Sequence, residues 1–241
     1  MGPCEILPNQ LWLGAAPAGN PDTCAILKGA GVTHIVNCTE RAPYPTPAQV
    51  PGPHGAGVIE HRVAIDDSPD ADIQSPLAGA IDFIDGAVGD GGVVYVHCAM
   101  GVSRSSTVVI AYRMSCLHET LREAFERTAN ARPVISPNLG FFRVLVSQEL
   151  ASSGSSTMSV TEYATQKLQA DMKAYAWAGI DDAAVVAAVE ASNGDVERAK
   201  TALERKVQHF FSAPASQAAS APAPAAAAAV PSGRSFLPPI A

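Results

Sequence analysis

The amino-acid sequence predicts an α/β fold in which a central, mostly parallel sheet is flanked by helices, followed by a small all-α three-helix bundle and a disordered tail. Three observations support this prediction. Short apolar segments alternate with segments of helical apolar spacing over residues 1–150. Residues 93–97, VVYVH, form a nearly continuous β-branched and aromatic run, typical of a strand buried on both faces. The composition then becomes Ser/Gly-rich and later Ala-rich, so the 241 residues are expected to hold one medium domain and one small unit.

The predicted elements follow one another along the first 150 residues. Apolar runs that end in turn or polar residues predict strands at residues 10–14, 32–37, 58–65 and 93–97. Helical spacing of apolar residues predicts helices at residues 22–29, 76–88, 104–117, 119–130 and 138–151. Between the second and third strands, residues 42–57 carry five prolines and three glycines, which predicts a loop.

The chain is predicted to divide into four parts. These are the α/β domain at residues 1–150, a flexible linker at 151–161, the helical bundle at 162–210 and an Ala/Pro-rich disordered tail at 211–241. Within the bundle, helices are expected at residues 181–192 and 195–206, because Asn193 and Gly194 favour a helix end and Asp195 favours a helix start.

Charge and cysteine content argue against several classes of protein. The net charge of −7 is a poor electrostatic match for nucleic acid or an anionic membrane surface, and no apolar run approaches the ~20 residues of a membrane-spanning helix. The amino terminus has no secretory signal pattern. The five cysteines are scattered without C-x-x-C spacing, so no metal, cofactor or disulfide framework is expected. We expect a reducing, cytoplasmic location, with a nuclear one left open.

The segment that carries chemistry is HCAMGVSRSS at residues 97–106. It places Cys98 at the end of a buried strand, then five loop residues, then Arg104 at the start of a helix. Loop N–H groups and a helix amino terminus stabilise negative charge, so they favour a thiolate at Cys98 and can cradle a phosphate dianion. The predicted phosphate-binding residues are Ala99, Met100, Gly101, Val102, Ser103 and Arg104.

The residues around the loop are assigned distinct roles. Gly101 lets the backbone turn closely around the anion, and the planar guanidinium of Arg104 can hold two phosphate oxygens at once. The Ser105 hydroxyl can donate to the sulfur, and His97 is expected to order the loop through backbone hydrogen bonds. The alternative interpretation is a buried strand-end cysteine beside a solvated arginine, which the surrounding strand, glycine, serine and helix make improbable.

Over residues 5–150 the sequence resembles the dual-specificity phosphatases, the compact branch of the cysteine-dependent protein tyrosine phosphatase superfamily. The resemblance rests on EILPNQLWLG, GVTHIVN, HCAMGVSRSS running into VVIAYRM, and RPVISPNLGFF. It implies a protein tyrosine phosphatase-like sheet and a phosphocysteine at Cys98. It also implies phosphate binding by Arg104, assistance by Ser105, bracing of the phosphate loop by Asn138, and a general acid upstream.

The general acid is sought in the segment DDSPDAD. Such a carboxyl protonates the departing oxygen and then takes a proton from the attacking water. The family places this residue directly after a strand and thirteen residues before a segment like AIDFID, which here indicates Asp67. Asp66 is the second candidate and Asp70 a distant third.

These residues predict metal-independent dephosphorylation of phosphotyrosine and of phosphoserine and phosphothreonine in proteins. The loop AMGVS carries no basic side chain, which disfavours phosphoinositides, and the 6% aromatic content disfavours a glucan substrate. Sulfurtransferase or arsenate-reductase chemistry uses similar loops but suits the upstream acid less well. The alternative to an enzyme is an adaptor protein, either phospho-reading or ubiquitin-linked, whose pocket binds phosphate with little turnover.

Cys38 ends the second predicted strand, on the side of the sheet where Cys98 is expected. It could trap an oxidised Cys98 as a reversible disulfide. The simpler interpretation, which we favour, is a small buried apolar residue.

The second unit resembles a ubiquitin-associated domain in its WAGI segment and in NGDV before the last helix. Its expected core residues are Val185, Val189, Val196, Ala199 and Leu203. The binding loop of that family reads Met-Gly-Phe or Tyr, whereas this chain has Ala178, Gly179 and Ile180. Ubiquitin is therefore expected to bind weakly if at all, and the alternative is a helical module that only extends the catalytic domain.

Overall fold

The structure, a computed structural model, describes residues 2–17, 20–40 and 57–212. The predicted loop at 42–57 therefore lies outside the described residues except for Gly57, and the predicted tail lies outside them beyond residue 212. The described residues form two compact units, divided between Ala164 and Thr165.

A five-stranded sheet with the order β1-β2-β5-β3-β4 forms the centre of the first unit. The strands are β1 (Cys4–Leu7), β2 (Leu11–Ala15), β3 (His34–Asn37), β4 (Ile59–Arg62) and β5 (Val94–Cys98). Among the strands that the structure describes, only β1 pairs in the antiparallel direction, with β2, so the sheet is mixed but mostly parallel, as predicted. Strand β1 was not among the predicted strands, because its four residues have no clear apolar alternation.

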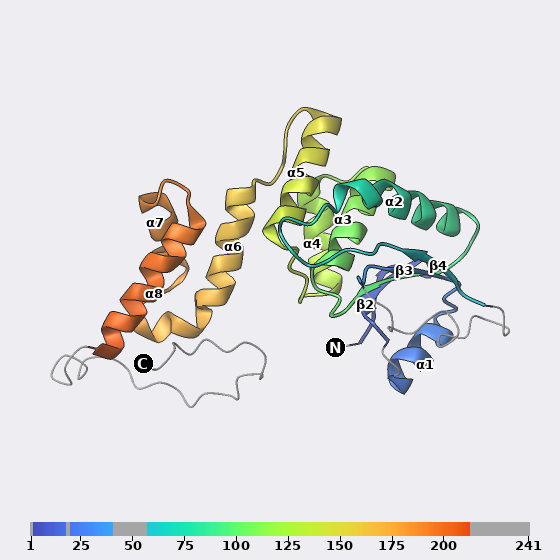
Figure 1. The fold of residues 1–241 in the computed structure, drawn as a ribbon, viewed down its shortest axis with the longest axis horizontal. Helices are drawn as coiled ribbons and strands as arrows, with labels where there is room; N and C mark the ends of the chain where they lie inside the picture. The colour runs from blue at the N-terminus through green and yellow to red at the C-terminus, as the bar shows by residue number, and fades with distance from the viewer. Residues whose placement is uncertain (1, 18–19, 41–56, 213–241) are drawn as a thin grey trace. The chain divides into compact units, whose positions relative to one another are not determined.

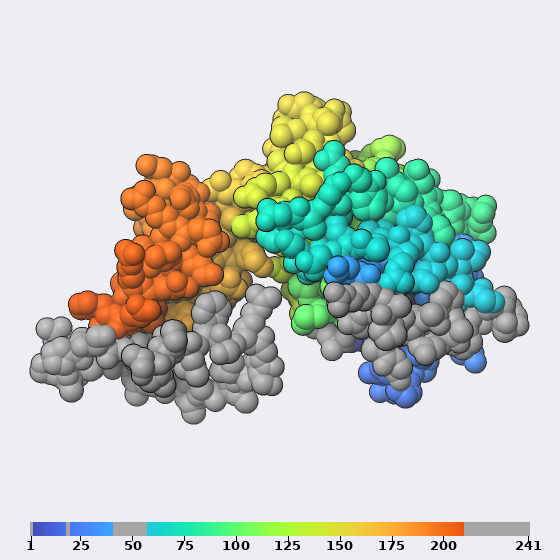
Figure 2. Space-filling model, viewed as in Figure 1, coloured from blue at the N-terminus to red at the C-terminus, as the bar shows by residue number. Residues whose placement is uncertain are grey.

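Helices cover both faces of this sheet (Figure 1). The larger group consists of α2 (Gln74–Gly89), α3 (Arg104–Cys116), α4 (Leu121–Ala131) and α5 (Leu139–Ser153). Alternate β5 residues supply the two cores: Val94 and Val96 pack with this group, whereas Tyr95 packs on the other face with Leu27 of α1 (Pro21–Gly29). In Figure 2, the cyan and teal segment from β4 through α2 covers much of the visible face of the first unit.

Helix α3 is buried along most of its length, although its sequence contains several polar residues. Every residue from Ser105 to Arg113 is buried, so its polar side chains must be satisfied inside the protein. Thr107 donates to the Ser103 carbonyl, and the Arg113 guanidinium donates to both carboxylate oxygens of Glu119. The amino terminus of a rigid helix is thereby held directly behind the phosphate loop.

The segment 151–161, predicted to be a flexible linker, is instead packed on the first unit. Helix α5 continues through Ser153 and ends at Gly154, whose φ of 76° is left-handed. The Thr157 N–H then donates to Glu149, and Met158 is buried in the main core. The prediction of a flexible linker was wrong here. A Ser/Gly-rich composition does not show that the polar groups of the segment bind the buried carboxylate of Glu149.

The second unit consists of helical segments around its own apolar core. They are the later part of α6 (Val160–Met172), the 3-10 helix η3 (Lys173–Ala178), α7 (Asp182–Ala191) and α8 (Val196–Ser212). The core contains four of the five predicted residues, while Val196 lies partly buried at its edge. Asn193 and Gly194 both have positive φ at the turn between α7 and α8, where the sequence predicted a break. No described helix in either unit is long and apolar enough to cross a membrane.

Candidate active site

The loop between β5 and α3 forms the site, at the edge of the sheet where the parallel strands end. Cys98 is the last residue of β5 and is 1% exposed. The segments that follow the two neighbouring strands bind the end of β5 through backbone hydrogen bonds. The Ala16 N–H donates to the Cys98 carbonyl at 2.7 Å, and the Cys38 N–H donates to the His97 carbonyl at 2.7 Å. The thiol therefore sits on a rigid base.

Gly101 makes the tight turn that surrounds the sulfur. Its φ is +67°, and its N–H lies 3.2 Å from Cys98 Sγ. A Cβ at this position would overlap the backbone of Gly14 and Ala15 in β2. Only glycine satisfies both requirements. The positive φ agrees with the predicted tight turn, whereas the close approach of β2 is a second reason that the sequence did not show.

The carbonyl groups of the loop are bound on the side away from the thiol. Arg132, 1% exposed, donates from Nε to the Gly101 carbonyl at 2.7 Å and from Nη2 to the Met100 carbonyl at 3.2 Å. The Ser136 N–H donates to the Val102 carbonyl at 2.8 Å. Because the carbonyls are held behind the loop, its N–H groups face the sulfur.

Sequence reasoning missed the role of Arg132. The residue lies inside the quoted segment RPVISPNLGFF, but the sequence does not distinguish a buried arginine from a solvated one. Its remaining donors reach the Gly2 carbonyl and Cys4 Sγ, so it also ties the amino-terminal segment to the loop.

The surroundings of Cys98 favour its thiolate. Burial by itself would raise the pKa of this thiol, but hydrogen bonds from the Ser105 hydroxyl and from the N–H groups of Ser105, Val102 and Met100 outweigh burial and lower it. The Ser105 hydroxyl lies 3.2 Å from the sulfur. The structure thus brings Cys98, the loop and Ser105 together as predicted.

We expect Ser105→Ala to raise the pKa of Cys98, because it removes the hydroxyl that donates to the thiolate. Since the thiolate is the reactive form, its reaction with a small haloacetamide should begin at higher pH than in the wild type. Peptide mass spectrometry across a pH series measures the Cys98 adduct alone. Ser115→Ala, at the other end of α3, is the matched control and should leave the midpoint in place. An unchanged midpoint in Ser105→Ala would contradict the role of this hydroxyl.

Arg104 lies at the first turn of α3 with its guanidinium over the site. Nη1 donates to the Ile65 carbonyl at 3.1 Å, which fixes the side chain from the preceding strand-to-helix segment. Nε is buried, lies 4.0 Å from Asp67 Oδ2, and makes no hydrogen bond to any residue that the structure describes. A buried guanidinium N–H without a hydrogen-bond partner is suited to donate to an oxygen of a bound phosphate.

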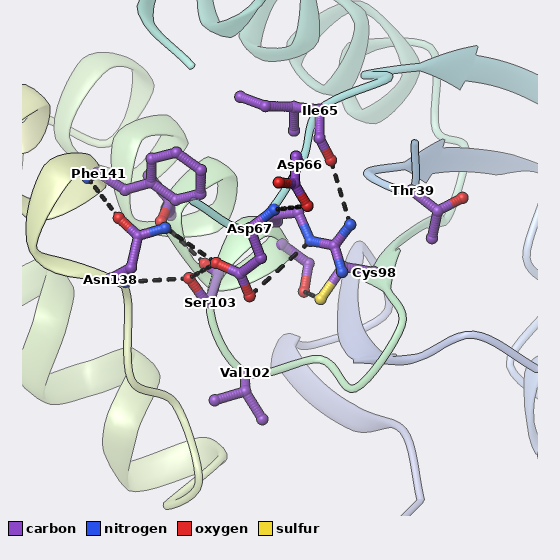
Figure 3. Close-up of polar contacts among 12 residues, drawn as sticks. Thr39, Ile65, Asp66, Asp67, Cys98, Val102, Ser103, Asn138 and Phe141 are labelled. Atoms are coloured by element: carbon purple, nitrogen blue, oxygen red, sulfur yellow. Dashed lines mark hydrogen bonds and ion pairs between the residues drawn. The ribbon is translucent and has the colours of Figure 1, made fainter. Parts of the chain in front are cut away.

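Asp67 is held above the loop by two donors (Figure 3). The Ser103 hydroxyl donates to Oδ1 at 2.6 Å and the Asn138 amide donates to the same atom at 2.9 Å. The other carboxylate oxygen, Oδ2, accepts neither of these hydrogen bonds and lies on the side of Arg104. It can therefore carry the proton of a general acid. The side chain is 38% exposed, so a leaving group can reach it.

The other two candidate acids are placed differently. Asp66 accepts the Asp67 N–H at 2.8 Å and therefore supports the turn rather than reaching the loop. Asp70 is exposed, and its contact in the structure is a backbone N–H donated to Ser68 at 3.4 Å. The geometry favours Asp67, the first choice from the sequence.

Asn138 connects three parts of the site. Its backbone N–H donates to the Ser103 hydroxyl at 3.0 Å, and its side-chain oxygen accepts the Phe141 N–H at 3.0 Å, which caps α5. Its amide nitrogen reaches Asp67. The resemblance assigned it to the phosphate loop, and the structure shows in addition that its side chain holds Asp67.

We expect Gly140→Ala to displace the acid. A Cβ on Gly140 would overlap the Pro69 backbone, two residues after Asp67, so the loop must move away from α5. A displacement near 1 Å can lower kcat/KM by about 10²-fold. Steady-state hydrolysis of phenyl phosphate measures this loss. Gly86→Ala, in α2 with open space around it, is the control and should retain activity; equal activity of both variants would show that this close approach is unimportant.

His97 takes no chemical part in this arrangement. Burial lowers its pKa to about 4, opposed by a hydrogen bond with the Cys98 backbone, so the ring is neutral near pH 7. It stacks on Tyr95 with the ring centres 5.5 Å apart. The hydrogen bond with the Cys98 backbone is of the predicted kind, whereas the buried Nδ1 has no hydrogen-bond partner among the described residues, so the ordering of the loop by His97 stays a prediction.

Cys38 lies one residue beyond the paired residues Asn37 and His97, as Cys98 does on the neighbouring strand. It is fully buried, and burial together with the nearby Cys98 raises its pKa well above the usual range. Such a thiol is a slow nucleophile, which agrees with a packing role. The disulfide with Cys98 stays a prediction.

The mixed α/β fold and a Cys-x5-Arg loop, with the Cys98 thiol at its start and the Asp67 carboxyl near Arg104, are the features of the cysteine-dependent phosphatase class. Residues 11–150 match the family model described as "Dual specificity phosphatase, catalytic domain". The chain therefore belongs to the dual specificity phosphatase family.

Individual relatives support this membership. The chain is 39% identical over 174 residues to Dual specificity protein phosphatase 1-A of Xenopus laevis and 36% identical to Dual specificity protein phosphatase 1 of Homo sapiens, in both cases over 68% of this chain and 44% of the relative. It thus spans less than half the length of these relatives. The crystal structure of human DUSP28 superposes with a TM-score of 0.54 and 35% identity, covering 62% of this chain and 94% of that chain.

Proposed function

We propose that this protein hydrolyses phosphotyrosine, phosphoserine and phosphothreonine in proteins through a phosphocysteine intermediate, without a metal ion. The observation that carries the proposal is the Cys98 thiol, whose pKa is lowered by hydrogen bonds from Ser105 and from loop N–H groups. It begins the loop that ends at Arg104, whose Nε lies 4.0 Å from Asp67 Oδ2. The described residues contain no cluster of three or more His, Cys, Asp or Glu side chains arranged to hold a metal.

In the first step the Cys98 thiolate attacks phosphorus and the bond to the leaving oxygen breaks. Asp67 gives its proton to that oxygen, so an alcohol or phenol leaves rather than an anion. Arg104 and the loop N–H groups hold the three remaining phosphoryl oxygens throughout.

In the second step a water molecule attacks the phosphocysteine, and the Asp67 carboxylate takes its proton. The sulfur–phosphorus bond breaks, inorganic phosphate leaves, and Cys98 returns as a thiolate. The Ser105 hydroxyl, 3.2 Å from the sulfur, stabilises the charge that reappears there.

The loop favours phosphorylated proteins over phosphoinositides as substrates. Residues 99–103 carry no basic side chain that a polyanionic lipid headgroup would need. The alternative, a phospho-reading or ubiquitin-linked adaptor with little turnover, is not favoured, because Cys98, Arg104 and Asp67 are all present and placed for chemistry.

The test is capture of the intermediate. Wild-type protein is mixed with an aryl phosphate in the presence of a chelator, quenched in acid, and its peptides are examined by mass spectrometry. A phosphoryl group on Cys98 is the expected result. Turnover without any phosphocysteine, or loss of turnover on adding the chelator, would contradict the proposed mechanism.

We further propose, as a second candidate activity, that the helical unit is a ubiquitin-associated domain with weak affinity. Its support is the left-handed Gly179, with φ 70°, between η3 and α7, and the core around Ile180 and Val185. Ile180 is 1% exposed, so only Ala178 and Gly179 of this loop can offer contact area. Titration of isotope-labelled ubiquitin with the full chain should shift ubiquitin resonances, and Ala178→Asp should remove the shifts; no shift at millimolar protein would favour a purely structural module.

A further inference from the structure

The first turn of α6 contributes a tyrosine to the catalytic unit. Tyr163 lies beyond residues 11–150, which the family model matches, yet it is 3% exposed and packs in the main core. Its ring stacks on Phe142 of α5 with the ring centres 3.8 Å apart and an interplanar angle of 10°. Phe125 of α4 meets the same ring edge-on at 5.5 Å.

The Tyr163 hydroxyl is aimed at the segment that holds the acid. It donates to the Pro137 carbonyl at 2.7 Å. Burial raises the pKa of this phenol to about 12, opposed by a hydrogen bond with Ser136, so the hydroxyl keeps its proton as a donor near pH 7.

The carbonyl of Pro137 and the N–H of Asn138 belong to one planar peptide group. Tyr163 binds the carbonyl end of this group, and the N–H end donates to the Ser103 hydroxyl at 3.0 Å. Rotation of the peptide plane would break both hydrogen bonds. The Tyr163 hydroxyl therefore sets the orientation of the backbone from which the Asn138 side chain reaches Asp67.

The start of α6 is anchored independently of this hydroxyl. The Glu149 carboxylate accepts the N–H groups of Leu121 and Thr157, each at 2.7 Å. Arg122 donates to the Glu162 carboxylate at 2.8 Å. Removing only the hydroxyl of Tyr163 should leave its ring and its helix in place.

We propose that Tyr163 is a positioning residue for phosphoryl transfer: through the Pro137–Asn138 peptide it keeps Asn138, and so Asp67, at the distance needed to protonate the leaving group. This inference rests on the proposed function. It extends the working catalytic unit of this chain past the end of α5 to the first turn of α6.

The test compares leaving groups in the full-length protein. An acid out of place slows release of phenol, a poor leaving group, more than release of p-nitrophenol, a good one. Tyr163→Phe removes one hydrogen bond. We therefore expect it to lower kcat/KM for phenyl phosphate about fivefold, with a smaller loss for p-nitrophenyl phosphate. Tyr175→Phe, in the second unit, is the matched control and should match the wild type with both substrates.

A double-mutant cycle separates positioning from general destabilisation. In the Asp67→Asn background, Tyr163→Phe should cause no further selective loss with phenyl phosphate, since the acid is already absent. Equal losses for both leaving groups, or the same selective loss with and without Asp67, would overturn the inference. A wild type that hydrolyses neither substrate would instead overturn the proposed function.

Discussion

Cys98→Ser should abolish hydrolysis of aryl phosphates while leaving phosphate binding intact. A serine hydroxyl loses its proton far less readily than a thiol, so it is a much poorer nucleophile toward phosphorus. The expected loss in kcat is on the order of 10⁴- to 10⁶-fold, the range typical for removal of a covalent nucleophile. Steady-state assays with p-nitrophenyl phosphate measure it.

The binding half of this prediction follows from the rest of the loop. Gly101, the loop N–H groups and Arg104 do not depend on the sulfur for their position, because Arg132 and Ile65 hold them. Equilibrium titration of Cys98→Ser with a phosphopeptide should therefore show saturable binding. Cys116→Ser, at the far end of α3, is the control and should keep full activity; substantial activity of Cys98→Ser would overturn the assignment of the nucleophile.

Asp67→Asn should produce the second largest effect, and its size should depend on the leaving group. An amide keeps the hydrogen bonds from Ser103 and Asn138 to its oxygen but has no acidic proton to give. We expect kcat/KM for phenyl phosphate to fall by about 10²- to 10⁴-fold. Stopped assays with phenyl phosphate and p-nitrophenyl phosphate measure this loss and its dependence on the leaving group.

Substitutions of the neighbouring carboxylates show whether the acid is Asp67. Asp70→Asn should behave as the wild type, because this side chain is exposed on the same loop. Asp66→Asn removes an acceptor of the Asp67 N–H, so a moderate loss without a change in leaving-group dependence is expected. A loss in Asp66→Asn that is selective for phenyl phosphate and larger than that of Asp67→Asn would transfer the role to Asp66.

Much of the fold follows from local patterns in the chain. The run VVYVH predicts β5, and its alternation places Val94 and Val96 on one core and Tyr95 on the other. The helices of the first unit begin and end within a few residues of their predicted bounds, since apolar spacing and caps act over one or two turns. Strand β1 was missed because its four residues show no clear apolar alternation. Segment 151–161 was taken as a linker because composition does not show that its polar groups bind Glu149 or that Met158 enters the core.

In the candidate site, too, some features follow from the sequence and others from the tertiary structure alone. By itself the sequence predicted the nucleophile and the phosphate-binding loop, since Cys98, Gly101, Arg104 and Ser105 lie within eight consecutive residues and their chemistry follows from their order along the chain. The family resemblance added Asp67 as the first candidate for the acid. Only the tertiary structure decided how Asp67 is held in place, that Arg132 binds the loop carbonyls, and that Tyr163 reaches Pro137. Hydrogen bonds between residues far apart in sequence have no local pattern: their geometry exists only after the sheet and helices have packed and excluded water from the groups involved.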